Sequence, residues 1–211
     1  MKYLKISTIL LIIFCVGFSY AQGSRLGIIG GINMANFSYD DDTEAESLTV
    51  FGVGAVFSIP AGKKMQLCFQ PMYLQKGASE ESGDMIYTLA YIEMPILIKL
   101  MLGENDTRPY IFGGPTVGML MSAKVEIDGL DDDFDVKDVL ESLDYGLCVG
   151  AGLDIAMGNN KLFIEASYNL GLADIVKGGT VDIMGEQDVP DQEVKTTGIK
   201  IMAGITMPLG Q

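Results

Sequence analysis

The sequence predicts an all-β protein, an eight-stranded antiparallel up-and-down transmembrane β-barrel with four long acidic outer loops and short periplasmic turns. Eight stretches of roughly ten or more residues alternate apolar residues with small or polar ones, which gives each strand one apolar face. The connections between these stretches alternate between long acidic segments and short turns, an asymmetry typical of outer-membrane barrels. Gly accounts for 26 of the 211 residues, as expected where strands bend around a narrow barrel.

The first 21 residues have the three-part pattern of a secretory signal peptide. Lys2 and Lys5 precede an apolar run, residues 6–18, and Ala21 precedes the expected cleavage site. The apolar run is shorter than the roughly 20 residues that a transmembrane helix needs. The sequence therefore predicts a signal peptide over residues 1–21 and one mature domain, the outer-membrane β-barrel, over residues 22–211.

The order of the strands follows from the turn-forming residues between the alternating stretches. Gly158-Asn159-Asn160-Lys161 is a strong hairpin signal. The loop over residues 125–143 contains a segment, residues 136–143, that could form a short amphipathic helix. The eight expected strands cover residues 25–37, 48–59, 65–76, 85–102, 109–124, 144–157, 162–172 and 196–209.

The fourth expected strand shows most clearly which face of the barrel meets lipid. Its even positions, among them Ile92 and Ile98, are uniformly apolar, whereas the odd face includes Tyr91, Glu93 and Lys99. A soluble ligand-binding barrel would place the apolar face inside and the charges outside. Charges that share a face with Gly, Ser and Asn instead indicate a polar interior and an exterior in contact with lipid.

A hairpin tip at Asn159-Asn160 fixes the expected register of the strands on either side. In this register Asp154 lies opposite Glu165 inside the barrel, and Lys200 or Lys99 supplies the neutralising charge. One interpretation of this pair is a paired-carboxylate active site. We favour a structural ion network, because inward-facing charges need partners in any small barrel. The expected network comprises Glu93, Lys99, Asp154, Glu165 and Lys200.

The composition argues against catalysis and against a metal centre. The chain has no His, which excludes Ser-His catalysis and His-ligated metal sites. The run Asp128–Asp135 lacks the ligand spacing of an EF-hand, so a solvated acidic loop is favoured over a calcium site. Cys68 and Cys148 are expected to be small packed residues of the interior, at heights too different for an easy disulfide. We therefore predict no catalytic, cofactor-binding or metal-binding residues.

The charge of the chain restricts its partners. With 14 basic and 28 acidic residues the formal net charge is −14, which disfavours nucleic acid as a partner because phosphate binding needs clustered Lys and Arg. Most of the carboxylates lie in the four long loops, so the protein is expected to present a negative surface to the medium. The expected partners are outer-membrane lipid and divalent cations that offset the charge of the acidic loops.

Two segments in the middle of the chain resemble a known family. Residues 91–99, YIEMPILIK, followed by residues 108–115, RPYIFGGP, look like the central hairpin of PorT-like outer-membrane β-barrel proteins. Residues 27–37 and 70–77 are similar to the first and third strands of that family. The resemblance covers the mature chain and implies an eight-stranded barrel in the outer membrane of a Gram-negative bacterium, without shared catalytic residues. The founding member is tied to a system that secretes proteins across this membrane.

Three functions are compatible with these observations. The favoured one is a small outer-membrane barrel with a packed polar interior and a structural or surface-interaction role, without enzymatic activity. The alternative, which the resemblance implies, is an accessory component of a protein-secretion or transport machine, with secretion-machine proteins as partners. The third is a narrow channel, which is disfavoured because side chains about fill the interior of an eight-stranded barrel.

Overall fold

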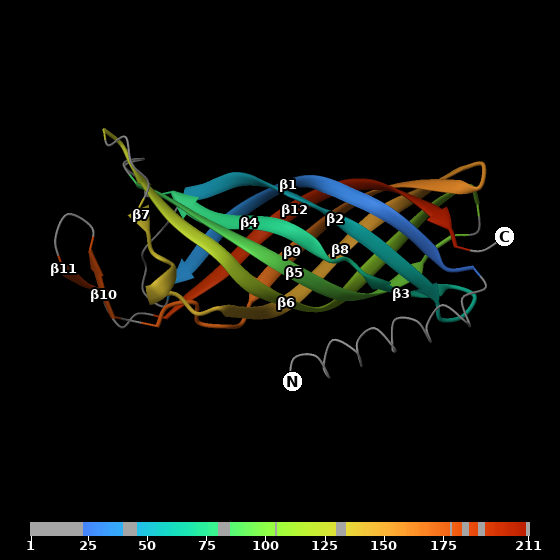
Figure 1. Cartoon of the computed structure of the whole chain (residues 1–211). Helices are drawn as coiled ribbons and strands as arrows, with labels where there is room; N and C mark the ends of the chain where they lie inside the picture. The colour runs from blue at the N-terminus through green and yellow to red at the C-terminus, as the bar shows by residue number, and fades with distance from the viewer. Residues whose placement is uncertain are drawn as a thin grey trace, which may run out of the picture.

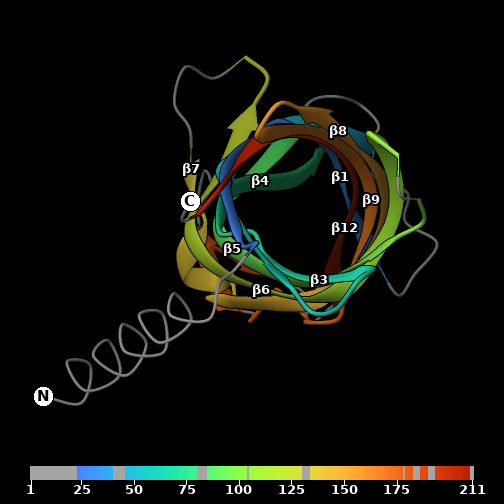
Figure 2. The same ribbon diagram turned by 90° about the vertical axis from the view of Figure 1, so that its right-hand side faces the viewer.

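A closed ring of long antiparallel strands forms the body of the protein in the computed structural model (Figures 1 and 2). The structure describes residues 23–39, 46–79, 85–103, 105–129, 134–177, 179–182, 186–189 and 193–209. The expected signal peptide over residues 1–21 lies outside the described residues, as do parts of all four acidic loops.

Eight crossings of the barrel wall are present among the described residues, because β3 and β4 together make one crossing. Every strand of the ring pairs antiparallel with its neighbours, and β1 pairs with β12 to close it. The strands of the ring are β1 (Arg25–Tyr39), β2 (Glu46–Pro60), β3 (Met65–Phe69), β4 (Met72–Ser79), β5 (Met85–Met101), β6 (Thr107–Ile127), β8 (Leu143–Met157), β9 (Asn160–Gly171) and β12 (Val194–Pro208).

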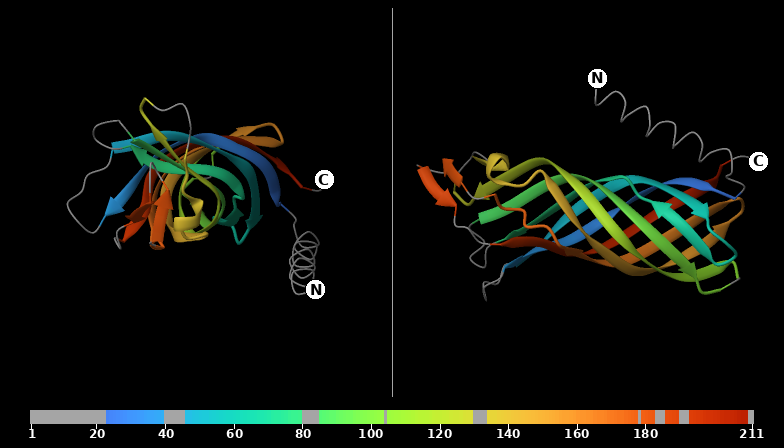
Figure 3. Two further views of the ribbon diagram at one scale, coloured as in Figure 1. Left: turned by 60° about the vertical axis from the view of Figure 1, so that its left-hand side comes forward. Right: turned by 90° about the horizontal axis from the view of Figure 1, so that it is seen from below.

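The two ends of the barrel differ in their connections (Figures 1 and 3). The end that carries the longer connections also carries the short elements β7 (Phe134–Asp135), η1 (Lys137–Val139), β10 (Gly179–Asp182) and β11 (Glu186–Val189). We call it the loop end. The opposite end, the turn end, carries the short turns and the C-terminal end of β12. The eight-stranded up-and-down barrel that the sequence predicts is confirmed.

The structure corrects three local expectations. The expected strand over residues 65–76 is divided at Gln70-Pro71, where Pro71 has no backbone N–H to donate to a neighbouring strand. The expected helix over residues 136–143 is only the single 3₁₀ turn η1, because Leu143 already belongs to β8 and lies opposite Met119 of β6. The short strands β7, β10 and β11 were not predicted from the alternation.

The outward face of the wall is apolar over its middle portion. On β5, Ile92 and Ile98 are exposed whereas Tyr91, Glu93 and Lys99 are buried, as the parity of the sequence predicts. The same alternation holds along β9 and β12. An exposed apolar band around a closed barrel suits contact with lipid rather than with water. Among the described residues, no helix is long and apolar enough to cross a membrane.

Apolar residues fill three levels of the interior. The first, the loop-end apolar cluster, joins the wall to η1 and to the segment after β9. The second cluster lies around Met72 and Met202. The third lies toward the turn end, around Cys68 and Cys148. The buried members of the first are Leu89, Tyr91, Leu120, Ala123, Val125, Val136, Val139, Ile175 and Val194. Those of the second are Ile29, Val56, Met72, Leu74, Phe163 and Met202, and those of the third are Cys68, Leu97, Met101, Tyr110, Phe112 and Cys148.

Candidate functional site in the barrel interior

Among the described residues we distinguish two buried ion clusters. Four charged side chains from four strands form the first, which we call the loop-end ion cluster. Lys76 Nζ on β4 lies 2.7 Å from Glu93 Oε2 and 2.9 Å from Asp144 Oδ2. Lys200 Nζ on β12 lies 3.0 Å from the second oxygen of Glu93, Oε1. The hydroxyl of Thr196 donates to Asp144 Oδ2 at 2.8 Å. Two ammonium groups and two carboxylates thus balance each other.

The second set, the turn-end ion cluster, contains a single ion pair. Lys99 on β5 forms a salt bridge with Glu165 on β9. The side-chain amide of Gln70 donates to Glu165 Oε2 at 3.1 Å, and the hydroxyl of Tyr110 donates to Glu165 Oε1 at 2.9 Å. Hydrogen bonds from two neutral donors therefore stabilise this carboxylate, and one lysine neutralises its charge.

Aromatic rings surround the ammonium group of the turn-end cluster. Lys99 Nζ lies 4.6 Å from the ring centroid of Tyr110, 5.2 Å from that of Phe163 and 5.7 Å from that of Phe112. The negative ring faces attract the cation at these distances, and the attraction grows when water is excluded. In the loop-end cluster, Lys76 Nζ lies 5.1 Å from the ring centroid of Tyr91.

A glycine on β8 lets Tyr110 reach its carboxylate. Gly152 lies opposite Tyr110 of β6 on one side and opposite Glu165 of β9 on the other. A Cβ atom at Gly152 would lie 2.6 Å from both Cζ and Oη of Tyr110, and also 2.6 Å from the backbone oxygen of Ile164. The missing side chain therefore provides the space in which the Tyr110 ring crosses β8. The abundance of Gly in the sequence has here a specific structural use.

The structure brings four of the five predicted network residues into these clusters and leaves one out. Glu93 and Lys200 are partners in the loop-end cluster, and Lys99 and Glu165 are partners in the turn-end cluster. Asp154 lies instead near the turn end, where its Oδ2 is 3.4 Å from Lys161 Nζ. The expected pairing of Lys200 with Asp154 or Glu165 does not occur among the ion pairs of the described residues.

The register that placed Asp154 opposite Glu165 is wrong by two residues. Asp154 lies opposite Phe163, and Gly152 lies opposite Glu165. The two central turn residues are Gly158 and Asn159, with Gly158 at φ +62°. Gly adopts this left-handed conformation without a steric penalty, so the turn is centred on it rather than on Asn159-Asn160. Because the error is an even number, every side chain keeps its predicted face.

Sequence reasoning missed the other ion-pairing and hydrogen-bonding participants in the clusters, which are Lys76, Asp144, Thr196, Gln70 and Tyr110. On the crossing over residues 65–79 the even positions face inward, but both faces are largely apolar. The charge of Lys76 therefore stands out less than that of Glu93 on β5. Asp144 directly follows an acidic loop in the sequence, yet it is 2% exposed and faces the interior.

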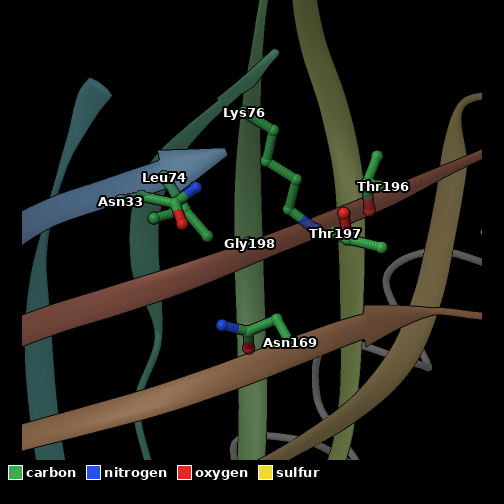
Figure 4. A pocket seen from close by; sticks show the side chains of 7 residues that line it. All are labelled: Asn33, Leu74, Lys76, Asn169, Thr196, Thr197 and Gly198. Carbon is green, nitrogen blue, oxygen red and sulfur yellow. The ribbon is translucent and has the colours of Figure 1, made fainter. Parts of the chain in front are cut away.

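A small pocket lies beside the loop-end cluster. This pocket of about 10 Å³, room for about one water molecule, is lined by the apolar side chain of Leu74 and by polar side chains that include Asn33, Lys76, Asn169 and Thr196 (Figure 4). Lys76 extends into it from β4 toward Thr196 and Thr197 of β12, while Asn169 approaches from β9. A second space of about 10 Å³ lies at the turn end, between Arg25, Asp154 and Lys99.

In both clusters, lysine ammonium groups and carboxylates neutralise each other's charge. Glu93 and Glu165 are each held by a lysine, so neither is poised as a free base. Among the described residues, no group of three or more Cys, Asp and Glu side chains is placed to hold a metal ion. The clusters fix strands on opposite parts of the wall to one another: β5 is tied to β12 by Glu93 and Lys200, and to β9 by Lys99 and Glu165.

Comparison with known families identifies the class of this barrel. A family model described as "Outer membrane protein beta-barrel domain" matches residues 20–177. The chain belongs to this family. It is thus an outer-membrane β-barrel protein of a Gram-negative bacterium, as the apolar exterior predicts. No curated protein sequence matches the chain.

Solved barrels from several bacteria are similar to this outer-membrane barrel in structure. Neisserial surface protein A has 12% sequence identity and a TM-score of 0.57, with coverage of 89% of this chain and 98% of that one. Ail, the attachment invasion locus protein of Yersinia pestis, has 16% identity and a TM-score of 0.47, with coverage of 88% and 100%. The outer membrane protease OmpT of Escherichia coli has 7% identity and a TM-score of 0.46, with coverage of 90% and 98%. At these identities the likeness to the Neisserial protein establishes the fold alone.

Proposed function

We propose that this outer-membrane barrel is a closed, non-catalytic protein with a structural or surface-interaction role. The observation that carries the proposal is the filling of its interior by neutralised ion clusters and apolar clusters. At the loop end, Val136, Val139 and Ile175 pack against the wall residues Leu89 and Val125. A diffusing ion would have to displace this apolar cluster and then separate the ion pairs beneath it.

The segments over the loop end are also joined through their backbones. Glu141 N donates to Ile175 O at 2.8 Å, and Lys177 N donates to Val139 O at 2.9 Å. Ile175 N donates in turn to Val194 O on β12 at 2.9 Å. The connections after β6 and after β9 thus hold each other in place, which favours a fixed surface over a wide opening.

Conductance measurement tests closure directly. The folded protein is inserted into a planar bilayer, with a gel-mobility shift on heating to verify the folded barrel and a large porin as the positive control. We expect no conductance steps from the barrel under conditions in which the porin conducts. Reproducible unit steps from verified folded protein would replace the proposal with the narrow channel.

A surface role also requires the acidic loops to face the medium. Single cysteines introduced by Ser47→Cys and by Asn159→Cys, each in a background without the native cysteines, test this in intact cells with a membrane-impermeant maleimide. We expect labelling at position 47 and none at position 159. The reverse pattern would contradict the orientation.

Divalent cations bound by the outward acidic loops are part of the same proposal, and removal of such ions by EDTA should weaken contacts between these loops and lipid phosphates.

The second candidate is an accessory component of a protein-secretion or transport machine. It is favoured by the resemblance of residues 91–99 and 108–115 to the central hairpin of PorT-like barrels. These residues lie on β5 and β6, which pair along most of their length. Chemical cross-linking in the native host, followed by purification in mild detergent, distinguishes the two: a stoichiometric set of secretion proteins supports the machine component, and isolation of the barrel alone supports the stand-alone role.

A further inference from the structure

Cys68 and Cys148 lie in one row of the barrel wall, with two strands between them. Cys68 of β3 is opposite Leu97 of β5, and Gly114 of β6 is opposite Cys148 of β8. Leu97 and Gly114 are adjacent across β5 and β6, because a Cβ atom at Gly114 would lie 3.1 Å from the Cα of Leu97. The row therefore runs Cys68, Leu97, Gly114, Cys148.

This row keeps the two thiols apart in the folded barrel. Adjacent strands are about 4.8 Å apart, so three steps along the row span roughly 14 Å of wall. A disulfide tolerates a Cα–Cα separation of at most about 7 Å. The obstacle to a bridge is therefore the presence of β5 and β6 between the cysteines, and not their heights alone.

Both thiols are also shielded from the surroundings. Cys68 is 0% exposed and Cys148 is 2% exposed, and both belong to the same buried apolar cluster. Among the described residues both are free cysteines. An oxidant in solution cannot reach either sulfur without opening of the wall.

Before the barrel folds, the two thiols are accessible to oxidants, because the unfolded chain crosses the periplasm on its way to the outer membrane. The periplasm promotes disulfide formation, and an unfolded chain brings residues 68 and 148 together at a modest entropic cost. Oxidation by a disulfide such as oxidised glutathione joins the two sulfurs, releases two molecules of reduced glutathione and moves one proton from each thiol to them. In the chain with this disulfide the two cysteines are held side by side, so β5 and β6 cannot take their positions between them.

We propose that folding of this barrel is under thiol control. The chain must reach the membrane with Cys68 and Cys148 reduced, a disulfide between them stops barrel assembly, and the completed barrel then protects both thiols from oxidation. The inference goes beyond the proposed function and does not depend on it, since a channel or a machine component with this wall would obey the same constraint.

A matched pair of disulfides tests the proposal. The full chain also contains Cys15, in the expected signal peptide, so the test uses Cys15→Ser to leave Cys68 and Cys148 as its two cysteines. This chain is unfolded in urea, oxidised to link Cys68 with Cys148, and diluted into liposomes. The control carries Cys15→Ser, Cys148→Ser and Ser58→Cys, because Ser58 lies directly opposite Cys68 on the adjacent strand β2. Oxidation of the control therefore joins neighbouring positions that the barrel brings together.

The gel-mobility shift on heating reports the folded barrel in each sample. We expect the chain linked between Cys68 and Cys148 to lose the folded band and to regain it when dithiothreitol is added. The linked control should give the folded band with and without dithiothreitol. Equal folding of the linked and the reduced native pair would overturn the proposal, and so would loss of folding in both linked chains, because the position of the tie would then be irrelevant.

A second measurement tests protection in the folded state. The reduced barrel, folded in liposomes, is incubated with oxidised glutathione, then denatured and treated with a polymer-bearing maleimide that adds one mass step per free thiol. We expect two mass steps in the Cys15→Ser chain before and after the incubation. Loss of these steps from folded protein would contradict the shielding.

Discussion

The two buried ion clusters solve the same problem in different ways. In the loop-end cluster, Glu93 accepts both lysines, and Lys76 in turn joins Glu93 to Asp144. In the turn-end cluster, Glu165 has one lysine, and neutral donors and aromatic rings supply the other contacts. From this difference we expect the number of charged partners, rather than burial alone, to determine how strongly a cluster depends on one residue.

The electrostatic reason lies in what remains after a partner is removed. In the loop-end cluster, loss of Glu93 leaves two buried ammonium groups, and the neutral contacts there are only the Thr196 hydroxyl on Asp144 and the Tyr91 ring near Lys76. In the turn-end cluster, hydrogen bonds and ring faces continue to stabilise the remaining ion after such a loss. We therefore expect the loop-end cluster to be the more sensitive of the two to neutralisation of one member.

The largest effect is expected from neutralisation of Glu93, the residue that holds both lysines. Glu93→Gln leaves Lys76 and Lys200 with Asp144 as the only carboxylate of the cluster, and removal of one partner from a buried ion pair costs about 3–5 kcal/mol. Urea unfolding in liposomes measures the loss. The matched control is Glu126→Gln on the exposed face of β6, which should change the stability by less than about 0.5 kcal/mol. Equal effects at the two sites would remove the basis of the comparison.

Neutralisation in the turn-end cluster should cost less. Lys99→Met leaves Glu165 with its hydrogen bonds from Gln70 and Tyr110, so we expect a loss below the about 3–5 kcal/mol that removal of a partner from a buried ion pair costs. The same unfolding assay gives the value. A loss greater than that for Glu93→Gln would show that neutral donors and rings do not moderate the removal of a charge.

Overpacking at Gly152 should disturb the turn-end cluster without change of charge. Gly152→Ala places a methyl group against the Tyr110 ring and the Ile164 carbonyl, and overpacking of this kind costs about 1–3 kcal/mol. The control is Gly103→Ala, where the nearest atom to the new Cβ would be Pro109 Cδ at 3.7 Å. Gly152→Ala should therefore cost less stability in a Tyr110→Ala background than in the parent protein, because the ring that the new methyl group would contact is absent. An equal cost in both backgrounds would mean that the ring does not occupy this space.

The smallest expected effect is the coupling free energy between Lys200 and Asp154, which should be close to zero. In a double-mutant cycle, Lys200→Met and Asp154→Asn should be additive within about 0.5 kcal/mol, because the two residues share no partner. Lys200→Met and Glu93→Gln should be strongly coupled, since these side chains are in contact. Strong coupling of Lys200 to Asp154 would favour the register expected from the sequence over the one in the structure.

The sequence determined the fold class and the face of each strand. Alternation is a local property with a period of two residues, and it places Ile92 outside and Glu93 inside whatever the neighbouring strands are. For the same reason the two-residue error in the Gly158 turn changed the partner of Asp154 but not its face. The long and short connections likewise predicted the up-and-down order of the ring.

Only the tertiary structure decided which charges meet. Lys200 of β12 and Glu93 of β5 belong to strands that are not neighbours, so their contact depends on the closure of the ring, the stagger between strands and the diameter of the barrel. The route of Tyr110 to Glu165 depends in addition on the empty space at Gly152. These are through-space relations among residues far apart in the chain, and a pattern with a period of two residues contains no information about them.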